Sequence, residues 1–298
     1  MALRITGCIT ALATPFTVEG QLDLPAWHEL IERQLAGGVE SIVVAGSTGE
    51  AASLTDEEYD TLLRLAVDQV AGRIPVIAGT GLSNTAKTIA LTQRAAQLGA
   101  DAALVVTPPY VRPTVHGLIA HYREVANQGG LPVILYNVPG RTGTDMDIRV
   151  VEALYQEPHI VGIKEARNDA ARMTALLAFR TDSFTILSGD DPTASRAMLE
   201  GADGLVSVGS NAAPRAFRRL CDLSRSGETE QAAVLNARME PLFDFFGIES
   251  NPIPVKAALQ LQGIGYGLRL PLQELSADNQ PALESAHALI GQIEADCT

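Results

Sequence analysis

Residues 41–78 read SIVVAGSTGEAASLTDEEYDTLLRLAVDQVAGRIPVIA. The apolar runs at 41–45 and 76–78 are short, rich in β-branched residues and nearly continuous, as strands buried on both faces are. Between them the hydrophobic period changes to 3.6, and one helix face carries Tyr59, Leu62, Leu63, Ala66, Val67 and Val70. Thr55 and Glu58 have the spacing of a capping box at the start of that helix. The segment therefore predicts a strand, a helix and a second, parallel strand.

The same alternation continues along most of the chain. Short apolar runs occur at 5–11, 41–45, 76–78, 102–106, 133–135, 160–163, 184–187 and 204–206. Eight strands, each followed by a helix, predict a closed (β/α)8 TIM barrel. A doubly wound open sheet is the competing architecture, but the first strand is not followed by a glycine-rich dinucleotide loop. We expect a catalytic barrel over 1–224 and a C-terminal helical region over 225–298, with helices at 228–246, 254–262 and 278–293.

Composition and charge exclude several classes of protein. Of 298 residues, 46% are hydrophobic and 19% are charged, which is globular composition rather than disorder. The net charge of −13 repels phosphate backbones and anionic lipids, so neither a nucleic-acid nor a membrane partner is expected. The cysteines Cys8, Cys221 and Cys297 show no close spacing, and no secretory leader or membrane span is evident. These features predict a cytoplasmic protein, with Cys8 and Cys221 packed as small apolar groups.

The residues that end the predicted strands are the candidates for chemistry, because barrel enzymes place their active sites there. Hydroxyls and small residues dominate these ends, among them Gly46-Ser47-Thr48-Gly49, Tyr136 and Gly189. The five histidines never take metal-ligand spacing, and neither a P-loop nor a nucleophile elbow is present. The sequence therefore predicts a site without a metal or nucleotide cofactor.

Lysine usage singles out one residue. The chain has only three lysines. Lys87 lies in an amphipathic stretch, where it is either solvated or a subunit contact, Lys256 lies in the first turn of a predicted helix, and the third is Lys164. Lys164 ends a strand that should be buried, where it either forms a structural ion pair with a carboxylate such as Glu165 or acts as a nucleophile. Burial in an apolar barrel favours the neutral amine, which attacks carbonyl groups. A pocket of hydroxyls with one such amine suits Schiff-base chemistry on a keto acid, whose carboxylate the hydroxyls and N–H groups of 46–49 would hold.

Structural explanations exist for the neighbouring signals. The segment 46–49 could be only a tight turn, Tyr136 could cap a strand, and Arg141 could be a solvated loop residue. Asp190 and Asp191 read as helix caps rather than an acid–base pair, with a helix starting at Asp191. Each signal is weak alone, and together with Lys164 they indicate one site.

Several motifs carry a family resemblance over nearly the whole chain. They are GSTGE at 46–50, VIAGTG at 76–81, VTPPYVRPT at 106–114, LYNVPGRTG at 135–143, GIKEA at 162–166, LSGDD at 187–191 and NPIPVK at 251–256. In this order they closely resemble the dihydrodipicolinate synthase family, within the pyruvate-dependent class I aldolases. The resemblance implies a lyase that condenses pyruvate with L-aspartate 4-semialdehyde to 4-hydroxy-tetrahydrodipicolinate, in diaminopimelate and lysine biosynthesis.

The resemblance also implies roles for single residues. Lys164 would form the imine with pyruvate without any cofactor, and Tyr136 would move protons during imine formation and cyclisation. Thr48 would contact the pyruvate carboxylate and share a proton relay with Ser47, which stands where the family usually has threonine. The remaining implied roles are a backbone contact to pyruvate at Val206, binding of the semialdehyde carboxylate by Arg141, a substrate contact at Gly189, and insertion of Tyr110 into a neighbouring subunit's site. The family is commonly a tetramer of two tight dimers.

Two alternative functions and one departure from the family follow from the same comparison. N-acetylneuraminate lyases and keto-deoxy-sugar-acid aldolases use the same imine, and a silent keto-acid-binding barrel would need no imine-forming amine. Arg141 suits a short second substrate with a carboxylate, which favours the synthase. At the positions that match the family's lysine feedback site, the chain carries Asp56, Tyr59, Ser83, Lys87 and Pro109. We therefore expect weak or absent inhibition by L-lysine.

Overall fold

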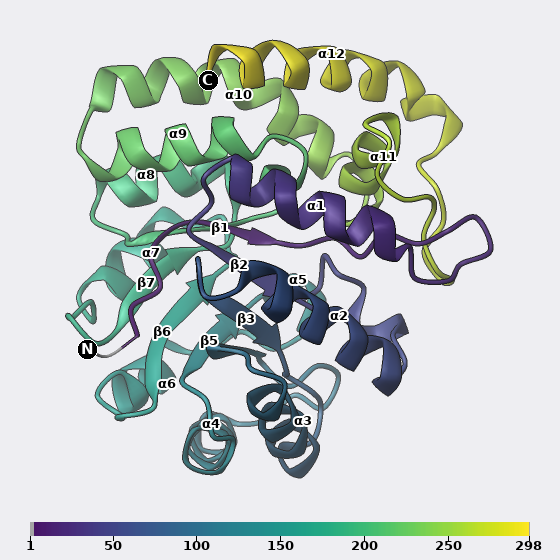
Figure 1. Ribbon diagram of the computed structural model, residues 1–298. Helices are drawn as coiled ribbons and strands as arrows, with labels where there is room; N and C mark the ends of the chain where they lie inside the picture. Colours follow the sequence, from purple (N-terminus) through teal and green to yellow (C-terminus); the bar gives the residue numbers. More distant parts are fainter. Residues whose placement is uncertain (1–2, 298) are drawn as a thin grey trace.

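The computed structural model describes residues 3–297, and within them eight parallel strands close into one barrel in sequence order (Figure 1). The strands are β1 (Gly7–Ala11), β2 (Ser41–Val44), β3 (Val76–Gly79), β4 (Ala102–Val106), β5 (Val133–Asn137), β6 (Ile160–Glu165), β7 (Thr185–Ser188) and β8 (Gly204–Ser207). Each overlaps a predicted run, so the TIM-barrel prediction is confirmed. Met1, Ala2 and Thr298, which end the two expected domains, lie outside the described residues.

Helices follow the strands and cover the barrel on the outside (Figure 1). The α-helices of this part are α1 (Leu24–Ala36), α2 (Asp56–Val70), α3 (Thr85–Gln97), α4 (Val115–Gln128), α5 (Pro139–Thr142), α6 (Ile148–Leu154), α7 (Ala170–Leu177), α8 (Ala194–Leu199) and α9 (Pro214–Arg225). Short 3₁₀ helices are η1 (Ala51–Ser53), η2 (Asp191–Thr193) and η3 (Gly209–Asn211). In α2 the capping box of Thr55 and Glu58 forms, and the predicted apolar face is buried. Local sequence signals thus determine where this helix begins and which face it packs.

The alternation of side chains along each strand divides the core into two layers. Ile134, Tyr136 and Val206 belong to a cluster inside the barrel, whereas Leu135 and Ile163 pack outward against the helices. In parallel pairing, residues in register point to the same side, so each strand end contributes alternately to the barrel mouth and to the helical layer. Cys8 and Cys221 are fully buried in the outer layer, as predicted.

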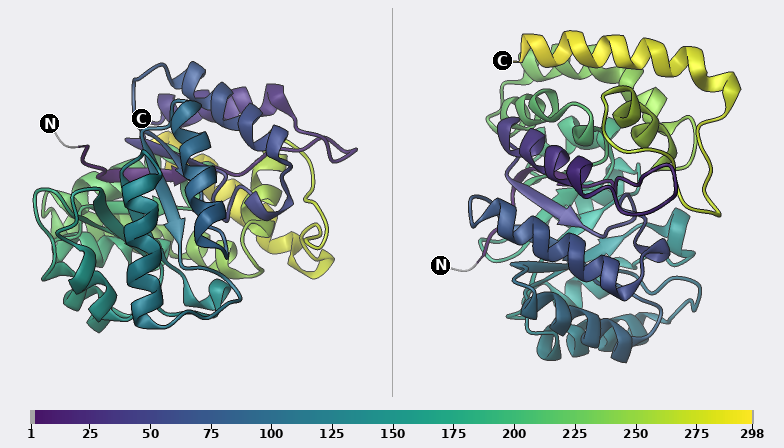
Figure 2. Two further views of the ribbon diagram at one scale, coloured as in Figure 1. Left: turned by 90° about the horizontal axis from the view of Figure 1, so that it is seen from below. Right: turned by 45° about the vertical axis from the view of Figure 1, so that its right-hand side comes forward.

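The remaining helices pack against α9 and against one another beside the barrel (Figure 2). They are α10 (Thr229–Gly247), α11 (Ile253–Leu261), the 3₁₀ helix η4 (Ala277–Asn279) and α12 (Gln280–Asp296). The predicted C-terminal helices are therefore present. The segment after α11 returns to the barrel, where the Tyr266 N–H donates to the carbonyl of Phe16 at 2.7 Å. No helix in the described part of the chain is long and apolar enough to cross a membrane.

The prediction that Asp191 caps a helix is wrong. Asp191 is the first residue of η2, and its side chain does not cap that helix. Its carboxylate instead accepts hydrogen bonds from the backbone N–H groups of Val208 and Gly209, at 3.2 and 2.8 Å. Asp191 is buried there, and burial raises the pKa of its carboxyl to about 6. The carboxylate thus joins the loops that follow β7 and β8.

Candidate active site

Lys164 lies near the end of β6 with its side chain directed into the barrel. It is in register with Tyr136 on one side and Leu187 on the other, and only 5% of the residue is exposed. Its Nζ atom lies 4.3 Å from the centre of the Tyr136 ring. Among residues 3–297 Lys164 forms no ion pair, and the alternative of a pair with Glu165 is wrong because that carboxylate bonds Arg172. The amine is therefore buried beside a phenol and has no ion-pair partner in the described part of the chain.

Gly189, the residue after β7, leaves the space that the Lys164 side chain occupies. A Cβ atom at this position would lie 2.6 Å from Cε and 2.9 Å from Cγ of Lys164, closer than real Cβ contacts. The Gly189 N–H donates to the carbonyl of Glu165 at 2.7 Å, which fixes the glycine beside β6. The structure thus brings the predicted residue Gly189 against the aliphatic stem of the lysine.

The loop after β2 places Thr48 at the same mouth of the barrel. The N–H of Gly49 donates to the carbonyl of Gly46 at 3.1 Å, so the predicted turn forms and this N–H is not available to a ligand carboxylate. Thr48 is 2% exposed, and its hydroxyl oxygen accepts a hydrogen bond from Nδ2 of Asn251 at 3.0 Å. Ser47 is half-buried in the same turn. Hydroxyls are therefore present where a carboxylate ligand was predicted.

A buried ion pair joins the loop after β2 to the C-terminal helices. Glu50 adopts the left-handed conformation (φ 51°), and its carboxylate lies 2.6 Å from Nζ of Lys256 on α11, with both side chains almost fully buried. The same Nζ lies 4.1 Å from the centre of the Phe16 ring. Burial lowers the pKa of Lys256 to about 8, and the charge of Glu50 opposes this shift. Lys256 lies at the start of a helix, as predicted, whereas its burial is not evident from the sequence.

Asn251 and Arg141 join two further parts of the mouth. Arg141 lies on α5 with an exposed side chain, and its NH2 group donates to the backbone carbonyl of Asn251 at 2.8 Å. Because the side chain of Asn251 bonds Thr48, this one residue links the predicted carboxylate-binding threonine to the predicted carboxylate-binding arginine. Asn251 opens the motif at 251–256, but nothing in the sequence alone assigns it a role.

Tyr110 occupies a different environment from Lys164. The residue is 93% exposed and has a positive φ of 73°, in the loop after β4. Its N–H donates to the carbonyl of Thr142 at 3.2 Å, and Thr107 donates to the hydroxyl of Thr142 at 2.9 Å. These bonds connect the loop to α5, whereas the Tyr110 hydroxyl makes no hydrogen bond within residues 3–297. Its position agrees with an outward projection rather than with a place in the buried mouth of its own chain.

Val206 adds an apolar side chain to the inner wall of the mouth. Val206, on β8, is 1% exposed and belongs to the cluster inside the barrel. In the described residues there is no group of three or more His, Cys, Asp or Glu side chains that could hold a metal ion. The described side chains thus present one amine, hydroxyls and an arginine to a small polar ligand.

Comparisons with known proteins agree on one family. The model of the Dihydrodipicolinate synthetase family matches residues 4–289. The chain is 63% identical to the 4-hydroxy-tetrahydrodipicolinate synthase of Xanthomonas campestris pv. campestris over 98% of its own length and 97% of that protein. It is 59% identical to the synthase of Stenotrophomonas maltophilia, over 98% and 99%.

Solved structures give the same result. The chloride-inhibited dihydrodipicolinate synthase of Acinetobacter baumannii, in complex with pyruvate, aligns with a TM-score of 0.94 at 42% identity, covering 96% of this chain and 99% of that one. A synthase variant described as the first monomeric one aligns with a TM-score of 0.94 at 37% identity, over 96% and 97%. With these matches, the resemblance read from the motifs is confirmed: the chain belongs to the Dihydrodipicolinate synthetase family.

Proposed function

We propose that this protein condenses pyruvate with L-aspartate 4-semialdehyde to form 4-hydroxy-tetrahydrodipicolinate, in diaminopimelate and lysine biosynthesis. The observation that carries the proposal is the uncompensated amine of Lys164, buried at the barrel mouth 4.3 Å from the centre of the Tyr136 ring. A lysine amine can attack a carbonyl carbon, and a phenol beside it can move protons. The names of the relatives and the pyruvate complex of one of them support the substrates.

The chemistry proceeds through covalent bonds to Lys164. Its nitrogen attacks C2 of pyruvate, and the carbonyl oxygen leaves as water, which gives an imine. Loss of a methyl proton yields an enamine, whose C3 attacks the aldehyde carbon of the semialdehyde and turns the aldehyde oxygen into a hydroxyl group. The amino nitrogen of the second substrate then attacks C2 and displaces Lys164, so the product contains both substrates less one water. We assign the proton transfers to Tyr136, with Thr48 and Ser47 as relay partners.

Binding of the two carboxylates is assigned to different walls of the mouth. Thr48, the backbone at Val206 and the segment with Gly189 would hold pyruvate, and Arg141 would bind the carboxylate of the semialdehyde. Arg141 is exposed at the rim and is anchored by Asn251 through one NH2 group, which leaves donors of the guanidinium for a ligand. This arrangement, with the names of the relatives, favours the synthase over a sugar-acid aldolase or a silent keto-acid-binding barrel.

The assembly is proposed from the exposure of Tyr110. A tyrosine that is 93% exposed on a left-handed loop residue is suited to contact a second copy of the chain, where its hydroxyl would complete the partner's relay. We propose a dimer as the active unit and a homotetramer of two dimers as the full assembly. One of the similar solved structures is described as a monomeric synthase variant, so the assembly has to be measured for this chain. The cytoplasmic location stays a prediction.

We further propose that the barrel at 1–224 carries the catalytic residues and that the helical region at 225–298 supports them. The helical region supports the site, because Lys256 pairs with Glu50 and Asn251 bonds Thr48. Both contacts hold the loop after β2, on which the pyruvate-binding hydroxyls lie.

The test is an assay with pyruvate and L-aspartate 4-semialdehyde, read by mass spectrometry, beside an assay with N-acetylneuraminate. We expect a product with the summed mass of the two substrates less one water, and no release of pyruvate from N-acetylneuraminate. The Lys164→Ala variant, with an unchanged melting temperature, should give no product. Cleavage of N-acetylneuraminate without condensation would instead identify a lyase, and inactivity in both assays would contradict the proposed function.

A further inference from the structure

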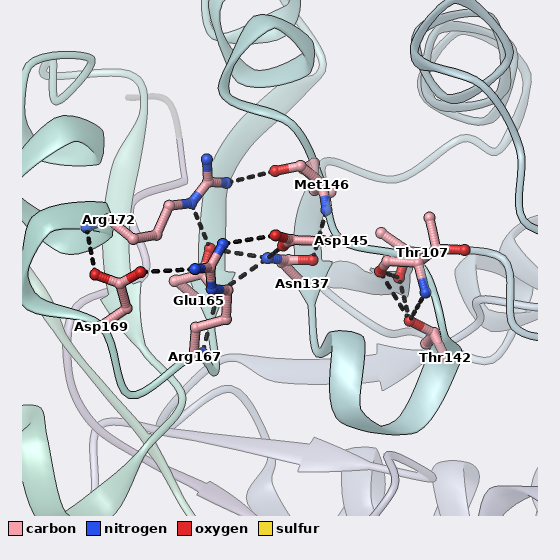
Figure 3. A network of polar contacts seen from close by, with 10 residues as sticks. Thr107, Asn137, Thr142, Asp145, Met146, Glu165, Arg167, Asp169 and Arg172 are labelled. Carbon is pink, nitrogen blue, oxygen red and sulfur yellow. Dashed lines mark hydrogen bonds and ion pairs between the residues drawn. The ribbon is translucent and has the colours of Figure 1, made fainter.

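A polar cluster centred on the buried side chains of Asn137 and Glu165 lies at the ends of β5 and β6 (Figure 3). Asn137 and Glu165 are the last residues of β5 and β6, are paired in register, and are both fully buried. Their predecessors Tyr136 and Lys164, also in register, point into the barrel. By strand alternation, Asn137 and Glu165 therefore point outward to the helical layer, one residue away from the chemistry.

The carboxylate of Glu165 accepts hydrogen bonds from three different residues. Both of its oxygens accept from Nδ2 of Asn137 at 3.0 Å, one accepts from Nε of Arg172 at 2.9 Å, and one accepts from the N–H of Arg167 at 3.0 Å. The ion pair with Arg172 is almost completely buried. These bonds connect the last residue of β5 to the last residue of β6, and they fix both strand ends to the start of α7.

The cluster also anchors the segment that carries Arg141 (Figure 3). Oδ1 of Asn137 accepts from the N–H of Met146 at 2.9 Å, and NH2 of Arg172 donates to the Met146 carbonyl at 2.8 Å. Asn137 Nδ2 donates to Asp145 at 2.8 Å as well. Because α5 lies between Asn137 and Asp145, both ends of the segment with Arg141 are held by the same cluster.

Stability alone gives no reason for charges at this place. The preceding outward positions on the same strands, Leu135 and Ile163, are apolar and pack well against the helices. Replacing a buried ion pair by well-packed apolar side chains is often neutral or stabilising, so a buried Glu165–Arg172 pair is not needed to hold two strands together. Hydrogen bonds differ from apolar contacts in that they specify direction and distance.

We propose that Asn137, Glu165 and Arg172 form a positioning unit for catalysis. It keeps the Lys164 amine and the Tyr136 phenol at the spacing that imine formation requires, and it holds the α5 segment over the mouth. Their side chains bond one another in the layer between the strands and the helices, outside the barrel mouth, so they are positioning residues and not catalytic ones. The proposal rests on the roles proposed above for Lys164 and Tyr136.

The experiment compares three variants with the wild type. Glu165→Gln removes the charge and keeps the shape, while Asn137→Ala removes the cross-strand bonds and keeps the Glu165–Arg172 pair. The control is Asp203→Asn at the opposite end of β8, where a buried carboxylate accepts from Arg4, Arg180 and the N–H of Ile186. The control therefore perturbs another buried carboxylate with arginine partners, at the end of β8 that faces away from the barrel mouth.

The rate constant of imine formation is measured at saturating pyruvate, at a temperature well below the melting temperature of each variant. Samples are quenched with borohydride at successive times, and the mass of the protein is determined by mass spectrometry. We expect Glu165→Gln and Asn137→Ala to slow imine formation by about 10- to 100-fold, since a misplacement near 1 Å can cost 10² in rate. The half-saturating pyruvate concentration should change by less than about threefold, because the pyruvate-binding groups lie on other strands. Asp203→Asn should lower the melting temperature and leave the rate constant unchanged.

Several outcomes separate the possible errors. If Asn137→Ala, whose ion pair is intact, forms the imine at the wild-type rate, the positioning unit is refuted, whether or not Glu165→Gln folds. An equal loss of rate in Asp203→Asn would refute it too, since the effect would then follow stability alone. A wild-type protein that gains no pyruvyl group contradicts the proposed function itself.

Discussion

Substitution of Gly189 by alanine should disable the enzyme without unfolding it. The added Cβ would lie 2.6 Å from Cε of Lys164, 2.9 Å from Cγ and 3.1 Å from Cβ of Ala166. Carbon atoms make favourable contacts at about 3.5–4.0 Å, so Cε has to move by roughly 1 Å. The contact with Cγ prevents the lysine from escaping by turning only its end. The amine is therefore displaced from Tyr136 and from the carbon that it attacks.

A displacement of this size should lower the rate of imine formation and kcat by about 100-fold. Overpacking should cost about 1–3 kcal/mol of stability, which leaves a folded protein. The assay is the time course of borohydride-trapped pyruvyl protein, with circular dichroism and the melting temperature as checks of folding. Gly291→Ala, in α12, is the control, because a Cβ there meets nothing within 4 Å. A folded Gly189→Ala protein with an imine-formation rate within about twofold of the wild type would show that this contact does not position the lysine.

Three further predictions concern stability, assembly and regulation. Burial raises the pKa of Asp191 to about 6, above its ordinary value. Between pH 4 and 6 the folded state therefore keeps a proton on this carboxyl that the unfolded state has lost. As a result, the free energy of unfolding decreases as the pH rises through that window. Relative to wild type, Asp191→Asn should therefore gain about 3 kcal/mol in its free energy of unfolding between pH 4 and 7, measured by urea titration, and a difference independent of pH would contradict the assignment. Tyr110→Phe should lower turnover by about 10- to 1,000-fold, and mixing it with Lys164→Ala subunits should restore activity through hybrid sites; no recovery in the mixture would place the tyrosine in its own chain's site. L-lysine should inhibit weakly or not at all, because Lys87 is exposed as a cation at a predicted effector position and Asp56 is already paired with Arg94 at 2.9 Å; half-inhibition below about 1 mM in a titration would show the reverse.

The barrel could be predicted from the sequence because its signals are local. Each buried parallel strand is a short continuous apolar run, and helix α2 carries its own capping box and apolar face, so neither needs knowledge of distant partners. The position of Lys164 followed from the same pattern, since a lone lysine at the end of a buried run has to face either the barrel or the helices. Register with Tyr136 then completes the central pair.

Contacts between distant segments could not be predicted in this way. The partner of Glu50 is 206 residues away on α11, and Asn251 reaches Thr48 across 203 residues, so no window of sequence shows either contact. Asp191 was misread because its neighbour Pro192 gives a local helix signal, whereas its N–H partners lie in the loop after the next strand. A usable signal was present in Glu165, since a charged residue inside a buried strand calls for a buried partner.

The most direct test of the account is the site of covalent attachment. The wild-type protein is incubated with pyruvate, reduced with borohydride, digested and mapped by mass spectrometry. The other buried lysine that could be labelled is Lys256. Burial lowers the pKa of Lys256 to about 8, but its amine lies 2.6 Å from the carboxylate of Glu50 and 4.1 Å from the centre of the Phe16 ring. We predict one reduced pyruvyl group per subunit, on the peptide that contains Lys164, and none in the Lys164→Ala variant. A group on Lys256 or Lys87, or an unlabelled wild-type protein, would contradict the account.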